Sequence, residues 1–224
     1  MSVYMTEEEQ IEAIKRWWKR YSNIIIVTIS LILLAIAGYK YWSWHQDKRT
    51  LQASNAYEHL MVAFSNKDTK KIHSYANQLI KEYTDTVYAD AARMTLAKLF
   101  VTNSKFKQAE EQLQHVASKS HMPALQQVAR IRLARILLSQ DQNDKALDKL
   151  DSVVDASYKP VIDELRGDIY AATGKYPQAV AAYRKAMNES QSQGIGNLFL
   201  EMKTNELVAY THSLNTNEEL KQTT

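Results

Sequence analysis

The most apolar part of the chain is a 19-residue stretch without a formal charge, from Tyr21 to Tyr39. A helix of that length spans roughly 28 Å at about 1.5 Å per residue, close to the hydrocarbon thickness of a bilayer. Indole rings prefer the headgroup layer, because one side of the ring is apolar and the other is polar. All four tryptophans of the chain flank the stretch, and we expect them to anchor a transmembrane helix over residues 21–41: Trp17, Trp18, Trp42 and Trp44.

A cleaved signal peptide is the main alternative for this stretch. Ala35-Ile36-Ala37 followed by Gly38 resembles the small-residue site of a signal peptidase. The segment before the apolar run is long for a signal peptide and carries four glutamates, and aromatic residues bracket the run on both sides. These features favour a retained membrane anchor.

Basic residues near the ends of the span predict its orientation. Lys15, Arg16, Lys19 and Arg20 precede the span closely, whereas only Lys40 follows it as closely. This predicts a cytoplasmic tail over residues 1–20 and a polar domain outside, which in a bacterium is the periplasm. We expect a juxtamembrane linker over 42–50, the periplasmic domain over 51–213 and a flexible C-terminus over 214–224.

The sequence pattern predicts helices throughout the polar part of the chain. Glycine and proline number only five and three in 224 residues, and alternating strand patterns are absent after residue 45. From Gly167 to Met187, small and aromatic residues recur at helical spacing around Gly174, which resembles the helix–turn–helix core of the tetratricopeptide repeat (TPR). Ala109, Ala146 and Ala179 take the same place in three successive copies, 37 and 33 residues apart.

The predicted fold class is therefore all-α: one N-terminal transmembrane helix followed by a TPR-like array of helical hairpins, a right-handed α-solenoid. A more divergent hairpin is expected upstream, with helices near residues 51–64 and 70–83. A last helix near residues 198–212 is expected to cap the array, in a region that departs from the repeat pattern after Met187.

The composition argues against nucleic-acid binding, metal binding and catalysis. The net charge is +3 and no strongly basic region is present, so nucleic acid is not an expected partner. The chain has no cysteine, its six histidines are scattered, and it lacks a phosphate-cradling glycine loop or a nucleophile motif. We expect no enzyme activity, no metal, no cofactor and no small-molecule substrate.

TPR arrays bind through a concave face lined by the first helix of each repeat. The register places a partly apolar and partly charged set of residues there as a candidate partner-binding groove: Met94, Lys98, Val101, Ile131, Arg132, Arg135, Leu138, Glu164, Leu165 and Asp168. The groove would accept an extended partner segment or an acidic chain end. Alternatively, Arg135 and Asp168 occupy equivalent positions in adjacent repeats and pair only with each other.

Several blocks resemble the YfgM family, the ancillary subunits of the bacterial SecYEG translocon, over residues from about 5 to 190. The tail block Gln10–Trp18 carries the most specific likeness, and similar blocks follow at Gly38–Trp42, Ala53–Tyr57, Arg132–Arg135 and Leu165–Asp168. The resemblance implies an accessory role at the inner membrane, with the SecYEG translocon, the periplasmic chaperone PpiD and emerging secreted chains as partners. Two other functions stay open from the residues: a regulator that holds a signalling factor through its cytoplasmic tail, and a scaffold for envelope assembly.

Overall fold

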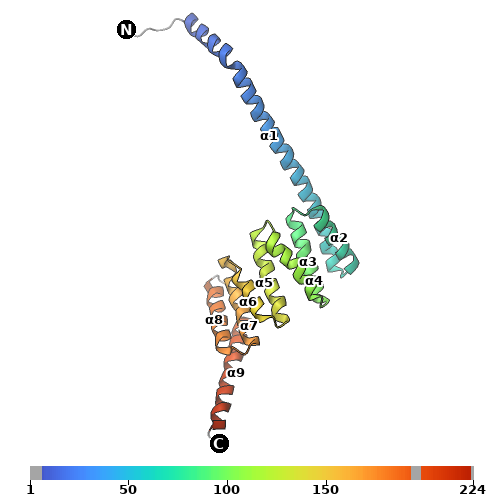
Figure 1. Ribbon diagram of the computed structural model, residues 1–224, viewed down its shortest axis with the longest axis vertical. Helices are drawn as coiled ribbons and strands as arrows, with labels where there is room; N and C mark the ends of the chain where they lie inside the picture. Colours follow the sequence, from blue (N-terminus) through green and yellow to red (C-terminus); the bar gives the residue numbers. More distant parts are fainter. Residues whose placement is uncertain (1–6, 193–197, 223–224) are drawn as a thin grey trace, which may run out of the picture. The chain divides into compact units, whose positions relative to one another are not determined.

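The computed structural model describes residues 7–192 and 198–222, and these ranges are helical with no strand (Figure 1). This confirms the all-α prediction. The elements are α1 (Glu7–Ser65), α2 (Thr69–Glu82), α3 (Val87–Thr102), α4 (Phe106–Lys119), α5 (Pro123–Ser139), α6 (Asn143–Asp151), a short 3-10 helix (Ala156–Tyr158), α7 (Lys159–Ala172), α8 (Tyr176–Ser192) and α9 (Leu198–Gln222). The chain divides into two compact units, Met1–Gln52 and Ala53–Thr224.

The first unit contains the N-terminal part of α1, which is long and apolar enough to cross a membrane. None of its most apolar 18-residue window is buried within the protein. The hydroxyl of Thr28 donates a hydrogen bond to the carbonyl of Ile24 at 2.8 Å, so this polar side chain is satisfied within the helix. Exposed apolar side chains thus lie all round this segment, as suits a lipid-facing helix.

The flanks of the span are helical too. Residues 42–50, expected to be a linker, lie within α1. The four tryptophan side chains are all more than half exposed. The ring of Trp17 lies 5.6 Å from that of Tyr21, and the Lys48 ammonium lies 5.3 Å from the ring centroid of Trp44. Exposed indoles with a neighbouring hydroxyl or cation suit the interfacial anchoring that the sequence predicts.

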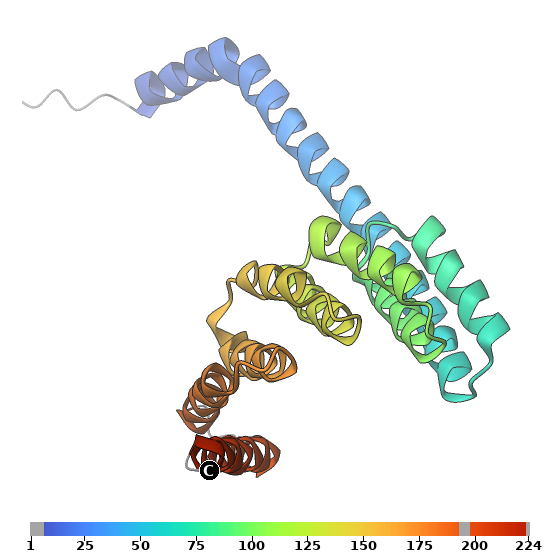
Figure 2. The same ribbon diagram turned by 60° about the horizontal axis from the view of Figure 1, so that its bottom comes forward.

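The second unit is an array of hairpins that follow one another in chain order (Figure 2). Within the described residues four hairpins are formed. The end of α1 shares a buried core with α2, and α3 packs with α4, α5 with α6, and α7 with α8. Helix α9 packs against α8. The hairpin predicted upstream and the predicted last helix are both present, and α9 continues past residue 213 to Gln222.

All four hairpins turn in the same way. The second residue after each first helix has a positive φ: Lys67 (56°), Ser104 (57°), Asp141 (57°) and Gly174 (72°). The backbone N–H of the next residue then donates to the carbonyl five residues earlier, at 2.8–3.0 Å, which satisfies a helix-end carbonyl. These turns are 37, 37 and 33 residues apart, the same spacing that the alanines predict.

Size-complementary pairs bring the two helices of each hairpin together. The members of each pair lie sixteen residues apart and are buried: Leu60 with Ala76, Ala97 with Leu113, Ala134 with Leu150, and Gly167 with Tyr183. In each pair one side chain is small where the other is large, so the helices approach closely without a void. Ala179 is also fully buried, in the cluster that contains Tyr183.

Candidate partner-binding groove

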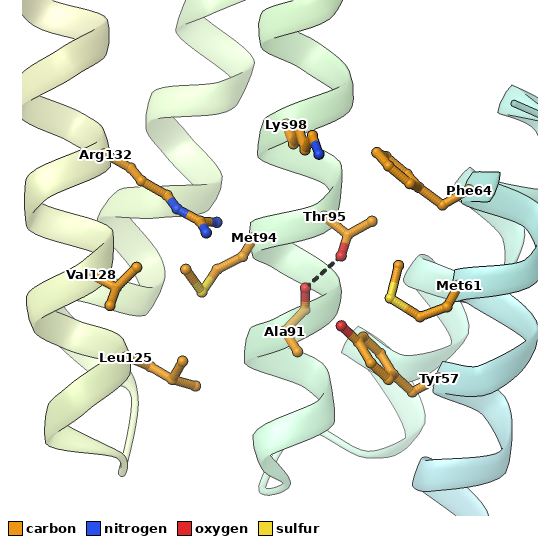
Figure 3. A pocket seen from close by; sticks show the side chains of 10 residues that line it. All are labelled: Tyr57, Met61, Phe64, Ala91, Met94, Thr95, Lys98, Leu125, Val128 and Arg132. Atoms are coloured by element: carbon orange, nitrogen blue, oxygen red, sulfur yellow. Dashed lines mark hydrogen bonds between the residues drawn. The ribbon is translucent and has the colours of Figure 1, made fainter. Parts of the chain in front are cut away.

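The first helices of the first three hairpins line a continuous groove in the second unit. Between α1, α3 and α5 lies a hollow of about 360 Å³ (Figure 3). Its walls are mostly apolar, with three polar side chains and the Tyr57 ring: Tyr57, Met61, Phe64, Ala91, Met94, Thr95, Lys98, Leu125, Val128 and Arg132. The Thr95 hydroxyl donates to the Ala91 carbonyl at 2.9 Å and so is already satisfied by its own helix.

A second hollow of about 480 Å³, between α3, α4 and α5, continues the first. The two hollows share Met94, Lys98 and Arg132, and the second adds Ala97, Val101, Thr102, Leu113, Arg135 and Ile136. Figure 3 shows Arg132 reaching from α5 toward Met94, and Lys98 beside the ring of Phe64. The two hollows together are called the inner groove below.

The inner groove is positively charged. Its only ionisable groups apart from the Tyr57 phenol are the cations of Lys98, Arg132 and Arg135. Among the side chains that the structure describes, no carboxylate forms an ion pair with any of the three. The Lys98 ammonium lies 5.1 Å from the ring centroid of Phe64, a cation–π distance.

The two arginines repel each other. Burial lowers the pKa of the Arg132 guanidinium from its ordinary value, the charge of Arg135 lowers it further, and Tyr57 acts in the opposite direction. Like charges one helical turn apart disfavour the helix by about 0.2–0.5 kcal/mol. The fold therefore keeps a small electrostatic cost in this groove.

Five of the predicted groove residues lie in the inner groove: Met94, Lys98, Val101, Arg132 and Arg135. Two others do not line it. Ile131 is buried in the core of the third hairpin, and Leu138 packs against the same core. Ile131 and Leu138 face the core rather than the groove, because α7 packs against that side of α5.

The fourth hairpin uses its charged residues internally. The Lys203 ammonium of α9 contacts the carboxylates of Glu164 at 3.2 Å and Asp168 at 2.8 Å. The hydroxyl of Tyr183 also donates to Asp168, at 2.8 Å. Burial lowers the pKa of Lys203, but the contacts with Asp168 and Glu164 outweigh it and raise that pKa overall.

The suggested pair of Arg135 with Asp168 is therefore wrong for the described part of the chain, where no ion pair joins the two. The capping helix supplies the counter-ion for Asp168. Leu165 is likewise core, in the cluster with Ile131. Glu164, Leu165 and Asp168 lie outside the inner groove.

Comparisons with known proteins agree with this geometry. A family model described as a tetratricopeptide repeat-like domain matches residues 15–209. The chain is 30% identical over 190 residues to the "Ancillary SecYEG translocon subunit" of Aggregatibacter actinomycetemcomitans, covering 85% of this chain and 93% of the relative. The chain belongs to this family of ancillary SecYEG translocon subunits.

Two further family members match over nearly their full lengths. The Escherichia coli K12 protein of the same name is 28% identical over 207 residues, with 92% of this chain and 99% of the relative covered. The Neisseria gonorrhoeae protein is 26% identical over 208 residues, with 92% and 100% covered. A solved structure of MamA (residue 41 to the end) from Desulfovibrio magneticus RS-1 aligns with a TM-score of 0.48 and 15% identity, over 78% of this chain and 96% of that one.

The family match includes the first hairpin, which contributes groove residues that the sequence analysis missed. Tyr57, Met61 and Phe64 of α1 lie 37 residues before Met94, Lys98 and Val101. Extending the repeat register one repeat upstream would have identified these three residues. Leu125 and Val128, two turns and one turn before Arg132 on α5, were missed because the register was read from the middle of each helix.

Proposed function

We propose that this protein is a non-enzymatic, single-pass accessory subunit of the Sec translocon in the bacterial inner membrane. The supporting observation is family membership over most of the chain, from the tail before the apolar helix through the hairpin array. The apolar first unit gives such a subunit its anchor. The hairpin array gives it a binding surface of the kind that repeat proteins use.

In this proposal residues 1–20 lie in the cytoplasm and the hairpin array lies in the periplasm. The argument is the basic cluster of Lys15, Arg16, Lys19 and Arg20 on one side of the span. On the other side only Lys40 lies as close to the span; Lys48 and Arg49 lie further out, and Lys48 lies against an indole ring. The array then faces the compartment into which the translocon delivers chains.

The inner groove is the proposed docking site for periplasmic partners, the chaperone PpiD and emerging secreted chains. It combines exposed apolar surface with fixed cations, both of which an unfolded or extended segment can satisfy. The fourth hairpin contributes less, since α9 covers and neutralises its acidic residues. Recognition is therefore assigned to the first three hairpins.

The test is partner capture by the full chain. An affinity-tagged protein is extracted from bacterial membranes in gentle detergent, with a photo-crosslinking residue at position 98 in the groove, at position 18 in the tail, or at Arg184 on the outer face as a control. We expect SecYEG to co-purify, and position 98, but not 184, to crosslink PpiD or a secreted chain.

Other outcomes would replace the proposal. Crosslinks formed only from position 18, without SecYEG, would identify a regulator that acts through its tail. Crosslinks from position 98 to envelope proteins, again without SecYEG, would identify an assembly scaffold.

A further inference from the structure

The inner groove contains three cations without a counter-ion among the described residues, on two different helices. Lys98 lies on α3, and Arg132 and Arg135 lie one turn apart on α5. In the fourth hairpin, by contrast, charged side chains pair with one another. Asp163 accepts from Arg166 at 3.1 Å and from Lys185 at 2.8 Å, and Lys203 contacts two carboxylates. The groove cations thus differ from the paired charges of the fourth hairpin.

The three cations belong to exposed residues that also line the apolar hollows. Met94 is buried and lines both hollows, and Tyr57, Leu125 and Val128 line the first hollow with it. Methionine adapts its shape readily, so it can close over side chains of different outline. Carboxylates brought to Arg132 and Arg135 would relieve the repulsion between them, and guanidinium groups bind carboxylates with good geometry.

The size of the hollows limits the form of the ligand. Volumes of about 360 and 480 Å³ accept bulky side chains, whereas a helix with its side chains is about 10–12 Å across. An extended strand of peptide can place one side chain in each hollow as it passes along α3. Because the three cations are spread over two helices and two hollows, two acidic side chains of one segment can pair with more of them than a single terminal carboxylate can.

We propose that the inner groove binds an extended internal peptide segment in which acidic side chains flank a large apolar one. The apolar side chain enters the hollow between α1, α3 and α5 beside Met94, and the carboxylates pair with Arg132, Arg135 and Lys98. This inference rests on the proposed function, because it names the chemistry of the segment that the periplasmic groove would capture. It assigns Arg132 and Arg135 as specificity residues for acidic over neutral segments.

The experiment measures peptide binding to the full chain in detergent micelles by fluorescence anisotropy. The probe is a short fluorescent peptide, blocked at both ends, in which aspartates flank a leucine. Matched peptides replace the aspartates with asparagine, replace the leucine with serine, or keep only a free C-terminal carboxylate. The protein variants are Arg132→Gln, Arg135→Gln and, as a control, Arg184→Gln on the exposed face of α8.

We expect the acidic peptide to bind, and each groove variant to weaken its Kd by about tenfold or more, as for the loss of a charge-assisted hydrogen bond. Arg184→Gln should leave the Kd unchanged, and all variants should keep the wild-type melting temperature. Binding should weaken as salt is raised. The asparagine and serine peptides should each bind more weakly than the probe.

Three results would overturn the inference. Equal binding of the asparagine peptide would remove the role of charge. Equal binding of the peptide with only a free C-terminus would show that the groove holds chain ends. Absence of binding while the full chain still captures SecYEG would refute the groove chemistry and leave the accessory function standing, whereas loss of SecYEG capture with retained peptide binding would refute only the proposed function.

Discussion

Helices α7 and α8 approach each other closely at Gly167, and its replacement by alanine is a direct test of the packing. A Cβ at this position would clash with Cε1 and Cδ1 of Tyr183 and lie 3.0 Å from Cζ. The ring cannot move aside freely, because it is 4% exposed and its hydroxyl donates to Asp168 at 2.8 Å.

The expected cost follows from three contributions. Forcing extra volume into a packed core costs about 1–3 kcal/mol. Displacing the ring weakens a hydrogen bond to a carboxylate, which is worth about 1.5–3 kcal/mol when lost entirely. Alanine regains about 1 kcal/mol of helix propensity over glycine in the middle of α7. We expect Gly167→Ala to lower the free energy of unfolding by about 2–3 kcal/mol.

The assay is urea unfolding of the full chain in detergent micelles, followed by circular dichroism. The decisive comparison repeats Gly167→Ala in a Tyr183→Leu background. That combination reproduces the pairs that the second and third hairpins already use, Ala97 with Leu113 and Ala134 with Leu150. There, Gly167→Ala should be neutral or stabilising, because the ring that it would strike is gone and part of the space is open. An equal loss in both backgrounds would refute the clash as the cause, as would a neutral effect in the wild-type background.

The remaining predictions concern the turns, acid titration and the anchor. Ser104→Gly should stabilise the array by about 0.5–1 kcal/mol, and Gly174→Ala should destabilise it by about 1–2 kcal/mol, because both residues have positive φ; thermal melts check the opposite signs. Burial and the neighbouring Asp163 raise the pKa of the Glu189 carboxyl. A carboxyl whose pKa is raised by folding favours the folded state at acidic pH, and this contribution is lost as the pH rises through the folded pKa. The melting temperature of Glu189→Gln relative to wild type should therefore increase from acidic to neutral pH. A difference that stays constant with pH would contradict this. If α1 is a retained span, the protein should stay in the membrane pellet through carbonate extraction, whereas a soluble fragment that begins at Gly38 would establish cleavage.

The helical content, the hairpin spacing and the last three hairpins could be predicted because their signals are local. Small residues at 97, 134 and 167 recur at the spacing of the turns, and each is followed sixteen residues later by a large one. The apolar helix was evident from composition alone, since a lipid-facing segment needs apolar side chains all round. Both features can be recognised in the sequence without knowledge of any tertiary contact.

The partners of charged residues could not be predicted, because they depend on a helix outside the repeat register. Asp168 and Arg135 occupy equivalent positions in adjacent repeats, which suggested a pair. The sequence after Met187 follows no repeat, so it gave no means of placing Lys203 against Asp168. Long cationic side chains reach whichever carboxylate the fold brings nearest, and spacing along the chain does not decide that.

The first hairpin explains why part of the groove was missed. Its size-complementary pair is inverted: Leu60 on the first helix is large and Ala76 on the second is small, the reverse of the three later hairpins. Close packing requires only that the summed volume of the pair be kept, so the inversion costs the fold little. It does remove the small residue from the first helix, and recognition of the repeat in the sequence depends on that residue. The same helix carries Tyr57, Met61 and Phe64, which form one wall of the inner groove. One face of this helix packs in the core and another face lines the groove. A substitution that is neutral for packing can therefore make the repeat, and with it the groove residues, hard to recognise in the sequence.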